Sequence, residues 1–115
     1  MELKTPYFLI DEAALEKNLR ILKSVSDASG AKILLAQKAY SCFATYPLIA
    51  KYLDGTAASG LYEARLGKEH FGKQTHVFSP AFREEETEEL AKYCDHVIFN
   101  SPAQAKKFAP FFRAR

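Results

Sequence analysis

Short apolar runs alternate along this chain with longer segments in which apolar residues recur every three or four positions. Runs of the first kind are typical of strands, and the recurrence is typical of helices. The predicted strands are residues 7–10, 32–39, 56–59, 76–79 and 96–100. The run 32–39 shows no polar alternation, which is typical of a strand buried on both faces. The pattern therefore predicts an α/β protein.

Helix signals fall between the predicted strands. Asp11 can cap a first helix in which Leu15, Leu19 and Leu22 share one face, and Gly30 suits its end. The later predicted helices are residues 47–53, a segment through Leu61, Ala64 and Arg65, residues 84–93 with an acidic first turn, and a segment from Ser101 with Pro102 at the first helical position and Gln104 at the third. Strand and helix thus alternate throughout.

The spacing of the predicted strand ends is regular. They fall at Lys38, Ser59, Ser79 and Asn100, which are 21, 20 and 21 residues apart. Strand–helix units of this length build parallel sheets with right-handed crossovers, either doubly wound or closed into a (β/α)8 barrel. The absence of a glycine-rich dinucleotide motif after any strand disfavours a nucleotide-binding sheet. All four residues lie where both architectures place their chemistry.

Charge and cysteine content narrow the class of protein. The net charge of +2 gives no reason to expect nucleic acid or a membrane surface as a partner, and no apolar stretch is long enough to cross a bilayer. Cys42 and Cys94 have no spacing typical of a metal site and are predicted to be reduced structural thiols. These features predict a soluble, cytoplasmic protein without a metal.

Lys38 interrupts the apolar run "ILLAQKAYS" and has two interpretations. A lysine at a strand end can extend its stem over apolar neighbours and keep its ammonium in water. Alternatively, burial lowers the pKa of a lysine, and the neutral amine can then attack an aldehyde. Glu63 and Arg65, farther along, are predicted to form a solvated ion-pair face.

Four stretches carry a family resemblance: "TPYFLIDEAALEKNLRIL", "LLAQKAYS", "AASGLYEARLG" and "HVFSPAF". Together they resemble the beginning of the fold-type III pyridoxal-phosphate enzymes, which include alanine racemases, ornithine decarboxylases and diaminopimelate decarboxylases. The stretches "QKAYS", "SGLYEARLG" and "VFSPAF" are most similar to the carboxynorspermidine decarboxylase branch. Other decarboxylases tend to carry an aspartate at Thr56 and a glutamate three residues after Ser59, whereas Glu63 is four residues after it.

The resemblance implies a (β/α)8 TIM barrel of the alanine racemase/ornithine decarboxylase type. Residues 1–115 would form its N-terminal part, with the C-terminal half-barrel and the β-domain absent. Such a barrel normally needs about 250 residues. The 115-residue chain alone is therefore expected to be inactive and marginally stable.

The resemblance also implies the cofactor, pyridoxal 5'-phosphate, and its site. Lys38 falls where the family carries the cofactor, and Ala36, pointing the same way, would leave room for its ring. Ser59 and Asn100 could reach the cofactor or substrate, although polar residues at strand ends also cap helices. The resemblance assigns no role to any histidine of this chain.

The implied activity is decarboxylation of carboxynorspermidine or carboxyspermidine to norspermidine or spermidine in polyamine biosynthesis, by a homodimer. Three alternatives stay open: another fold-type III amino-acid decarboxylase, a non-catalytic pyridoxal-phosphate-binding barrel for cofactor homeostasis, and an inactive truncated fragment.

Overall fold

The computed structural model describes residues 2–113. Its helices are α1 (Glu12–Ser29), α2 (Tyr46–Ile49), α3 (Leu61–His70), α4 (Glu84–Tyr93) and α5 (Pro102–Arg113), with a 3-10 turn, η1 (Phe43–Thr45). Its strands are β1 (Leu34–Ala36), β2 (Gly55–Ala58), β3 (Gln74–Phe78) and β4 (His96–Ile98). None of the described helices combines the length and the apolar character needed to cross a membrane.

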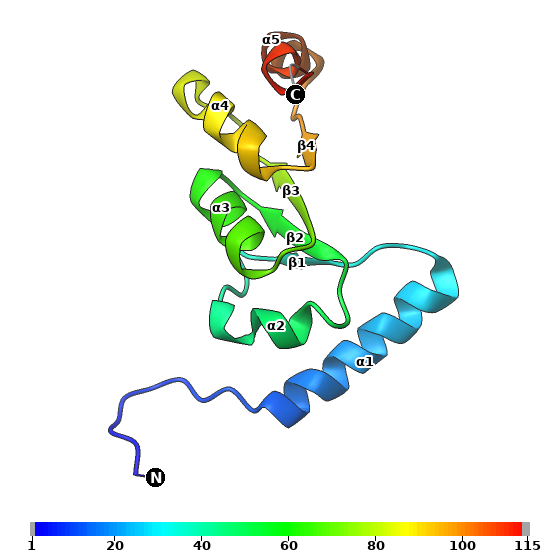
Figure 1. Cartoon of the computed structure of the whole chain (residues 1–115), viewed down its shortest axis with the longest axis vertical. Coiled ribbons are helices and arrows are strands. Elements are labelled where there is room, and N and C mark those ends of the chain that lie inside the picture. Colours follow the sequence, from blue (N-terminus) through cyan, green and yellow to red (C-terminus); the bar gives the residue numbers. More distant parts are fainter. Residues whose placement is uncertain (1, 114–115) are drawn as a thin grey trace.

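The four strands form one parallel sheet in the order β1-β2-β3-β4, which confirms the predicted parallel α/β architecture. Figure 1 shows the strands following one another along the long axis of the molecule. Because each connection crosses from one strand to the next with the same hand, the helices between the strands lie on one face of the sheet. Ala36, Ala57, His76 and His96 share one row on the other face. These four side chains are exposed or half-buried, and we call this the open face.

Two apolar clusters hold the helices against the sheet. The first joins α1, α2 and the end of α3 and contains Leu19, Tyr46, Ile49, Leu53 and Phe71. The second joins α3 and α4 to β2 and β3 and contains Ala58, Leu61, Ala64, Val77 and Leu90. Burying one of the larger aliphatic or aromatic side chains contributes about 1.5–3 kcal/mol, so the two clusters account for the attachment of the helices to one face.

Local signals placed the ends of α1 and α4 and the beginning of α5 correctly, whereas α2 ends at Ile49 and not at the predicted Leu53. The side chain of Asp11 accepts a hydrogen bond from the Ala14 amide at 3.0 Å, and Gly30 ends α1 in the left-handed region at φ 73°. The acidic first turn of α4 is where the sequence predicts it, and the helix has the predicted bounds. Ser101 caps α5 by accepting a hydrogen bond from the Gln104 amide at 3.1 Å.

The predicted strand over residues 7–10 is wrong. These residues pair with no strand among residues 2–113, and all four side chains are exposed, Phe8 completely. An apolar run becomes a strand only where a neighbouring strand can accept and donate its backbone hydrogen bonds. The described part of the sheet begins with β1, which pairs with β2 and not with this segment.

The strand predicted over residues 32–39 is shorter than expected. β1 ends at Ala36, whose carbonyl accepts hydrogen bonds from the amides of Ala39 and Tyr40 at 3.0 and 3.2 Å. The chain therefore turns at residues 37–39, and Lys38 lies in this turn rather than at the last position of the strand. The strand is also only half-buried, because the described residues leave its open face uncovered.

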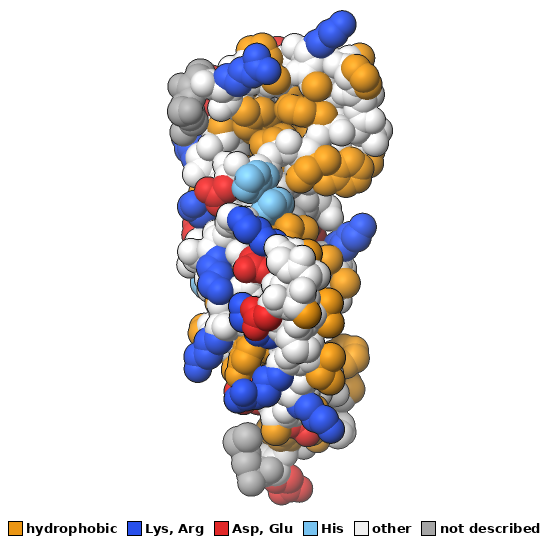
Figure 2. Space-filling model, turned by 90° about the vertical axis from the view of Figure 1, so that its right-hand side faces the viewer, with side chains coloured by type: hydrophobic (Ala, Val, Ile, Leu, Met, Phe, Trp, Pro, Cys, Tyr) orange, Lys and Arg blue, Asp and Glu red, His pale blue; other side chains and the backbone are white. Residues whose placement is uncertain are grey.

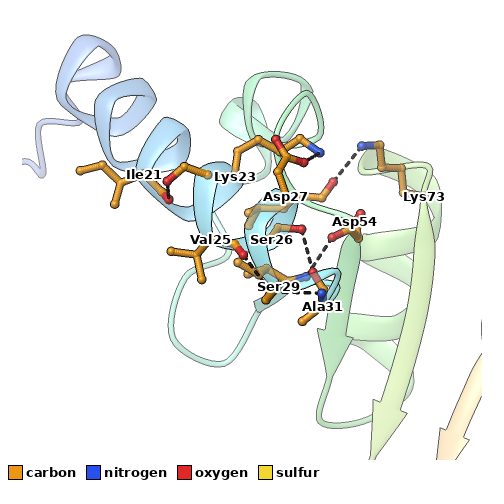
Figure 3. A network of polar contacts seen from close by, with 12 residues as sticks. Ile21, Lys23, Val25, Ser26, Asp27, Ser29, Ala31, Asp54 and Lys73 are labelled. Carbon is orange, nitrogen blue, oxygen red and sulfur yellow. Dashed lines mark hydrogen bonds and ion pairs between the residues drawn. The ribbon is translucent and has the colours of Figure 1, made fainter.

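Side-chain hydrogen bonds fix the beginnings of the strands. Asp54, which lies directly before β2 and is labelled in Figure 3, accepts a hydrogen bond from the Ile33 amide at 2.8 Å. Asp95, directly before β4, accepts one from the Thr75 amide at 2.9 Å. In the same region Ser26 of α1 donates to the Ala31 carbonyl at 2.7 Å (Figure 3). The two aspartate bonds connect neighbouring strands at the end of the sheet opposite to Lys38.

Replacement of Thr75 by valine is expected to raise the free energy of unfolding by about 1 kcal/mol. Thr75 is fully buried and its hydroxyl has no hydrogen-bond partner among the described residues, so valine removes an unsatisfied group at constant shape. The matched control is Thr87→Val, because the equally buried Thr87 hydroxyl donates to the Arg83 carbonyl at 2.9 Å. That variant is expected to lose about 1 kcal/mol. Urea denaturation measures both, and a loss of stability in Thr75→Val would contradict the expectation.

Candidate active site

A small cavity of about 90 Å³ lies at the carboxyl ends of β1, β2 and β3. Its lining residues are Ala36, Lys38, Ala57, Ala58, Ser59 and Phe78. We call it the Lys38 cavity. Three of the four candidate residues from the sequence, Lys38, Ala36 and Ser59, therefore meet at one site, as parallel strands in adjacent positions require.

The desolvated setting expected for Lys38 is not formed by residues 2–113. The Lys38 side chain is exposed, because it follows the short strand β1 in a turn and the open face beside it is uncovered. The small side chains of Ala36 and Ala57 are adjacent in the sheet register, so they leave space next to the lysine. A primary amine beside such a space can attack the carbonyl carbon of a planar ligand when it is unprotonated.

Ser59 is held by the helix that follows it. Its backbone amide donates to Oε2 of Glu63, in the first turn of α3, at 2.7 Å. The predicted solvated ion-pair face is confirmed for Arg65, which pairs with Glu69 at 2.9 Å, whereas Glu63 uses its carboxylate on the Ser59 amide. A carboxylate in the first turn of a helix is well placed to accept such an amide, because the helix dipole favours negative charge there.

Asn100 lies apart from the Lys38 cavity. It follows β4, and β3 separates that strand from β2. Its backbone amide donates to Oε1 of Gln104 at 2.5 Å, and Nε2 of Gln104 donates to the Pro80 carbonyl at 3.0 Å. Gln104 thus links Asn100 to the loop after β3. This link lies at the β4 edge of the sheet, at the far end from β1. The sequence predicted its place at a strand end but not its distance from Lys38.

Gln37 forms a buried polar network behind Lys38. Its Nε2 donates to the backbone carbonyl of Glu63 at 2.8 Å, and its Oε1 accepts from the Tyr46 hydroxyl at 2.9 Å. Burial, assisted by the negative charge of Glu63, raises the pKa of Tyr46 to about 12, so the phenol keeps the proton that it donates. Sequence reasoning missed Gln37, although it directly precedes Lys38 in the same apolar run.

Two histidines face each other on the open face. The rings of His76 and His96, which are register partners on β3 and β4, stack with centroids 4.3 Å apart. Partial burial and the neighbouring His96 lower the pKa of His76, so two adjacent positive charges are disfavoured there. Neither ring lines the Lys38 cavity.

Cys42 and Cys94 are free thiols, as predicted. Burial raises the pKa of Cys94 to about 12, which keeps the thiol protonated and chemically inert near neutral pH. Among residues 2–113 no group of three or more histidine, cysteine or acidic side chains is arranged to hold a metal ion.

A second, larger cavity of about 430 Å³ opens beside β4, between α4 and α5. Its lining combines the apolar residues Ala91, Cys94, Val97, Phe99, Ala109 and Phe112 with the charged residues Asp95 and Arg113. Hydrophobic side chains gather near the α5 end of the face drawn in Figure 2. This cavity shares no lining residue with the Lys38 cavity, and it contains none of the residues predicted for the active site.

Known proteins resemble this chain over nearly all of its length. The carboxynorspermidine/carboxyspermidine decarboxylase of Herminiimonas arsenicoxydans is 44% identical over 107 residues, which cover 93% of this chain and 29% of the relative. The protein of the same name from Campylobacter jejuni is 42% identical over 107 residues, covering 93% and 28%. A carboxyaminopropylagmatine decarboxylase from Synechocystis is 33% identical over 106 residues, covering 92% and 27%.

A solved structure agrees with these relatives. The crystal structure of carboxynorspermidine decarboxylase from Campylobacter jejuni, complexed with norspermidine, matches 96% of this chain with a TM-score of 0.94 and 40% identity. The match covers 30% of that structure. No family model matches the chain. The resemblance to carboxynorspermidine decarboxylases is thus confirmed, and the chain spans less than a third of the length of the relatives it matches.

Proposed function

We propose that Lys38 belongs to the active site of a pyridoxal-phosphate-dependent decarboxylase acting on carboxynorspermidine or carboxyspermidine. The proposal applies to a full-length enzyme, by which we mean a polypeptide of the relatives' length that contains this segment. The observation that carries it is the meeting of Lys38, Ala36 and Ser59 in one cavity, in a chain 42–44% identical to decarboxylases of that name. The products would be norspermidine and spermidine.

The fold of the full-length enzyme is proposed to be a (β/α)8 barrel, with this segment as its first half. The strand order supports this proposal, because β1-β2-β3-β4 is sequential and its helices lie on one face. A doubly wound sheet reverses its strand order and has helices on both faces. In a barrel the open face, with Ala36, Ala57, His76 and His96, would be the interior.

The residues present fit one end of the proposed cofactor. Pyridoxal phosphate, when bound, supplies an electron sink for the carbanion left by loss of CO2. Lys38 would hold the group covalently through Nζ and take it up again after the product leaves. Ala36 and Ala57 would give its ring space without a side chain in the way. Ser59 lines the same cavity and is held in place by Glu63. A role of Asn100 toward the cofactor or substrate stays a prediction.

A related substrate is the second candidate. The Synechocystis relative is named for carboxyaminopropylagmatine, which the name describes as a carboxylated amine of the same general kind. Its identity to this chain, 33%, is lower than the 42–44% of the carboxynorspermidine/carboxyspermidine decarboxylases, so we place it second. A homodimer and a cytoplasmic location stay predictions from the resemblance.

The test is a substrate comparison with the full-length enzyme. CO2 release is measured with carboxynorspermidine, carboxyspermidine, carboxyaminopropylagmatine, ornithine and diaminopimelate, each with pyridoxal phosphate. We expect the first two to give the highest kcat/KM. A higher value for diaminopimelate or ornithine would place the enzyme in another branch. Cofactor binding without CO2 release from any of the five would instead indicate a homeostasis protein.

A further inference from the structure

Gln37 and Lys38 are neighbours in the chain but lie in opposite environments. The Gln37 side chain is only 2% exposed, whereas Lys38 is exposed at the cavity. The Gln37 amide donates to the Ala57 carbonyl at 3.1 Å, which continues the sheet ladder one residue beyond β1. The backbone of Gln37 is therefore the last part of the sheet before the turn that carries Lys38.

The Gln37 side chain is held at both of its polar atoms. Nε2 is fixed by the Glu63 carbonyl in α3, and Oε1 by the Tyr46 hydroxyl in α2. Buried amides that are satisfied in this way are oriented by their partners, whereas an apolar side chain of the same size would fill the space without a fixed direction. Two helices thus define how the backbone leaves β1 and, with it, the direction of the next side chain.

Glu63 extends this arrangement to the other side of the cavity. Its carbonyl accepts from Gln37 and its carboxylate accepts from the Ser59 amide, so one residue contacts the ends of both β1 and β2. Gly67, one turn farther along α3, permits the close approach: a Cβ there would lie 3.1 Å from Nε2 of Gln37 and 2.3 Å from Oγ1 of Thr56. The network spans the two strand ends that border Lys38.

We propose that Gln37 is a positioning residue for Lys38, acting through Tyr46 and Glu63 to hold the amine where the proposed cofactor needs it. This inference rests on the proposed function of Lys38. The inference goes beyond that function because it assigns a role to Gln37, Tyr46 and Glu63. These three residues lie on the helix-covered side of the sheet and do not line the Lys38 cavity.

The experiment uses the full-length enzyme freed of cofactor. Pyridoxal phosphate is added, the mixture is quenched with borohydride at increasing times, and peptide mapping gives the rate at which Lys38 is labelled. Gln37→Met keeps the size of the side chain and removes both hydrogen bonds, and Tyr46→Phe removes only one. We expect the labelling rate and kcat to fall at least tenfold in Gln37→Met and less in Tyr46→Phe, with KM changed less than threefold in both.

Two further variants separate positioning from general stability. Ile49→Val disturbs the apolar cluster that also contains Tyr46, and it leaves the hydrogen bonds of Gln37 in place. It is expected to lower the thermal midpoint and leave the labelling rate within twofold of the parent. Gln37→Glu offers a hydroxyl donor and a carbonyl acceptor when protonated. Its labelling rate, relative to the parent, should therefore recover as the pH falls and drop as the carboxyl ionises.

The outcomes are distinguishable. A parental labelling rate and kcat in Gln37→Met would overturn the positioning role, even if Lys38 is the labelled residue. Labelling of a different lysine in the parent enzyme would instead contradict the proposed function. If Gln37→Met does not fold, Tyr46→Phe and the pH profile of Gln37→Glu decide: parental labelling in Tyr46→Phe together with a parental pH profile overturns the inference.

Discussion

Replacement of Lys38 by alanine is expected to abolish CO2 release by the full-length enzyme, with kcat reduced by about 10³-fold or more, as for other covalent nucleophiles. Alanine offers no amine at the Lys38 cavity, and no other lysine among residues 2–113 lines it. Lys38→Arg is expected to fail as well, because a guanidinium keeps the charge but stays protonated at neutral pH. The pair of variants therefore tests nucleophilicity rather than charge.

The matched control is Lys51→Ala, which removes an exposed lysine from the turn after α2. It should keep parental activity. The direct measurement is borohydride reduction with pyridoxal phosphate followed by peptide mapping, which should label Lys38 in the parent and in Lys51→Ala. Retention of turnover in Lys38→Ala, or a label on another lysine in the parent, would refute the assignment.

Replacement of Gly67 by alanine is expected to lower the free energy of unfolding by about 1–3 kcal/mol, the usual cost of overpacking. A Cβ at this position would lie 2.3 Å from Oγ1 of Thr56 and 3.2 Å from its Cβ. Thr56 is fully buried in β2 and cannot move aside without shifting the strand. The clash must outweigh the gain of about 1 kcal/mol that alanine normally gives over glycine inside a helix.

Gly60→Ala provides the control on the same helix. Gly60 precedes α3 in extended backbone, and a Cβ there meets no atom within 4 Å. The free energy of unfolding of Gly60→Ala, measured by urea denaturation, should stay close to that of the parent. Because Gly67 also lies against Gln37, Gly67→Ala should in addition slow the labelling of Lys38. Equal stability of Gly67→Ala and the parent would show that α3 can withdraw from the sheet at little cost.

Features that depend on a few neighbouring residues were predictable from the sequence. The caps at Asp11, Gly30 and Ser101 form as expected, because each satisfies backbone groups within five residues of itself. α4 has the predicted bounds, since an acidic first turn and helical spacing are local signals. The regular spacing of strands also predicted the parallel sheet, because a crossover of this length admits few other arrangements.

The meeting of Lys38 with Ser59 agrees with the same reasoning, since both lie within two residues of the carboxyl ends of parallel strands. The sequence did not determine which strands would be adjacent. Asn100 has the same kind of position, yet it lies two strands away from Ser59, because the order of strands in the sheet sets that distance. The spacing between successive strand ends is 20 or 21 residues throughout the chain, and it does not show which strands lie next to each other.

Other features were decided only by contacts between distant segments. Residues 7–10 have the composition of a strand but find no partner among the described residues, and backbone pairing is not a property of one segment. No pattern in the sequence distinguishes Gln37, and its side-chain amide is buried because Tyr46 and Glu63 come from two helices with the matching donor and acceptor. A polar side chain can leave water only where such partners are already in place, and only the tertiary structure brings them there.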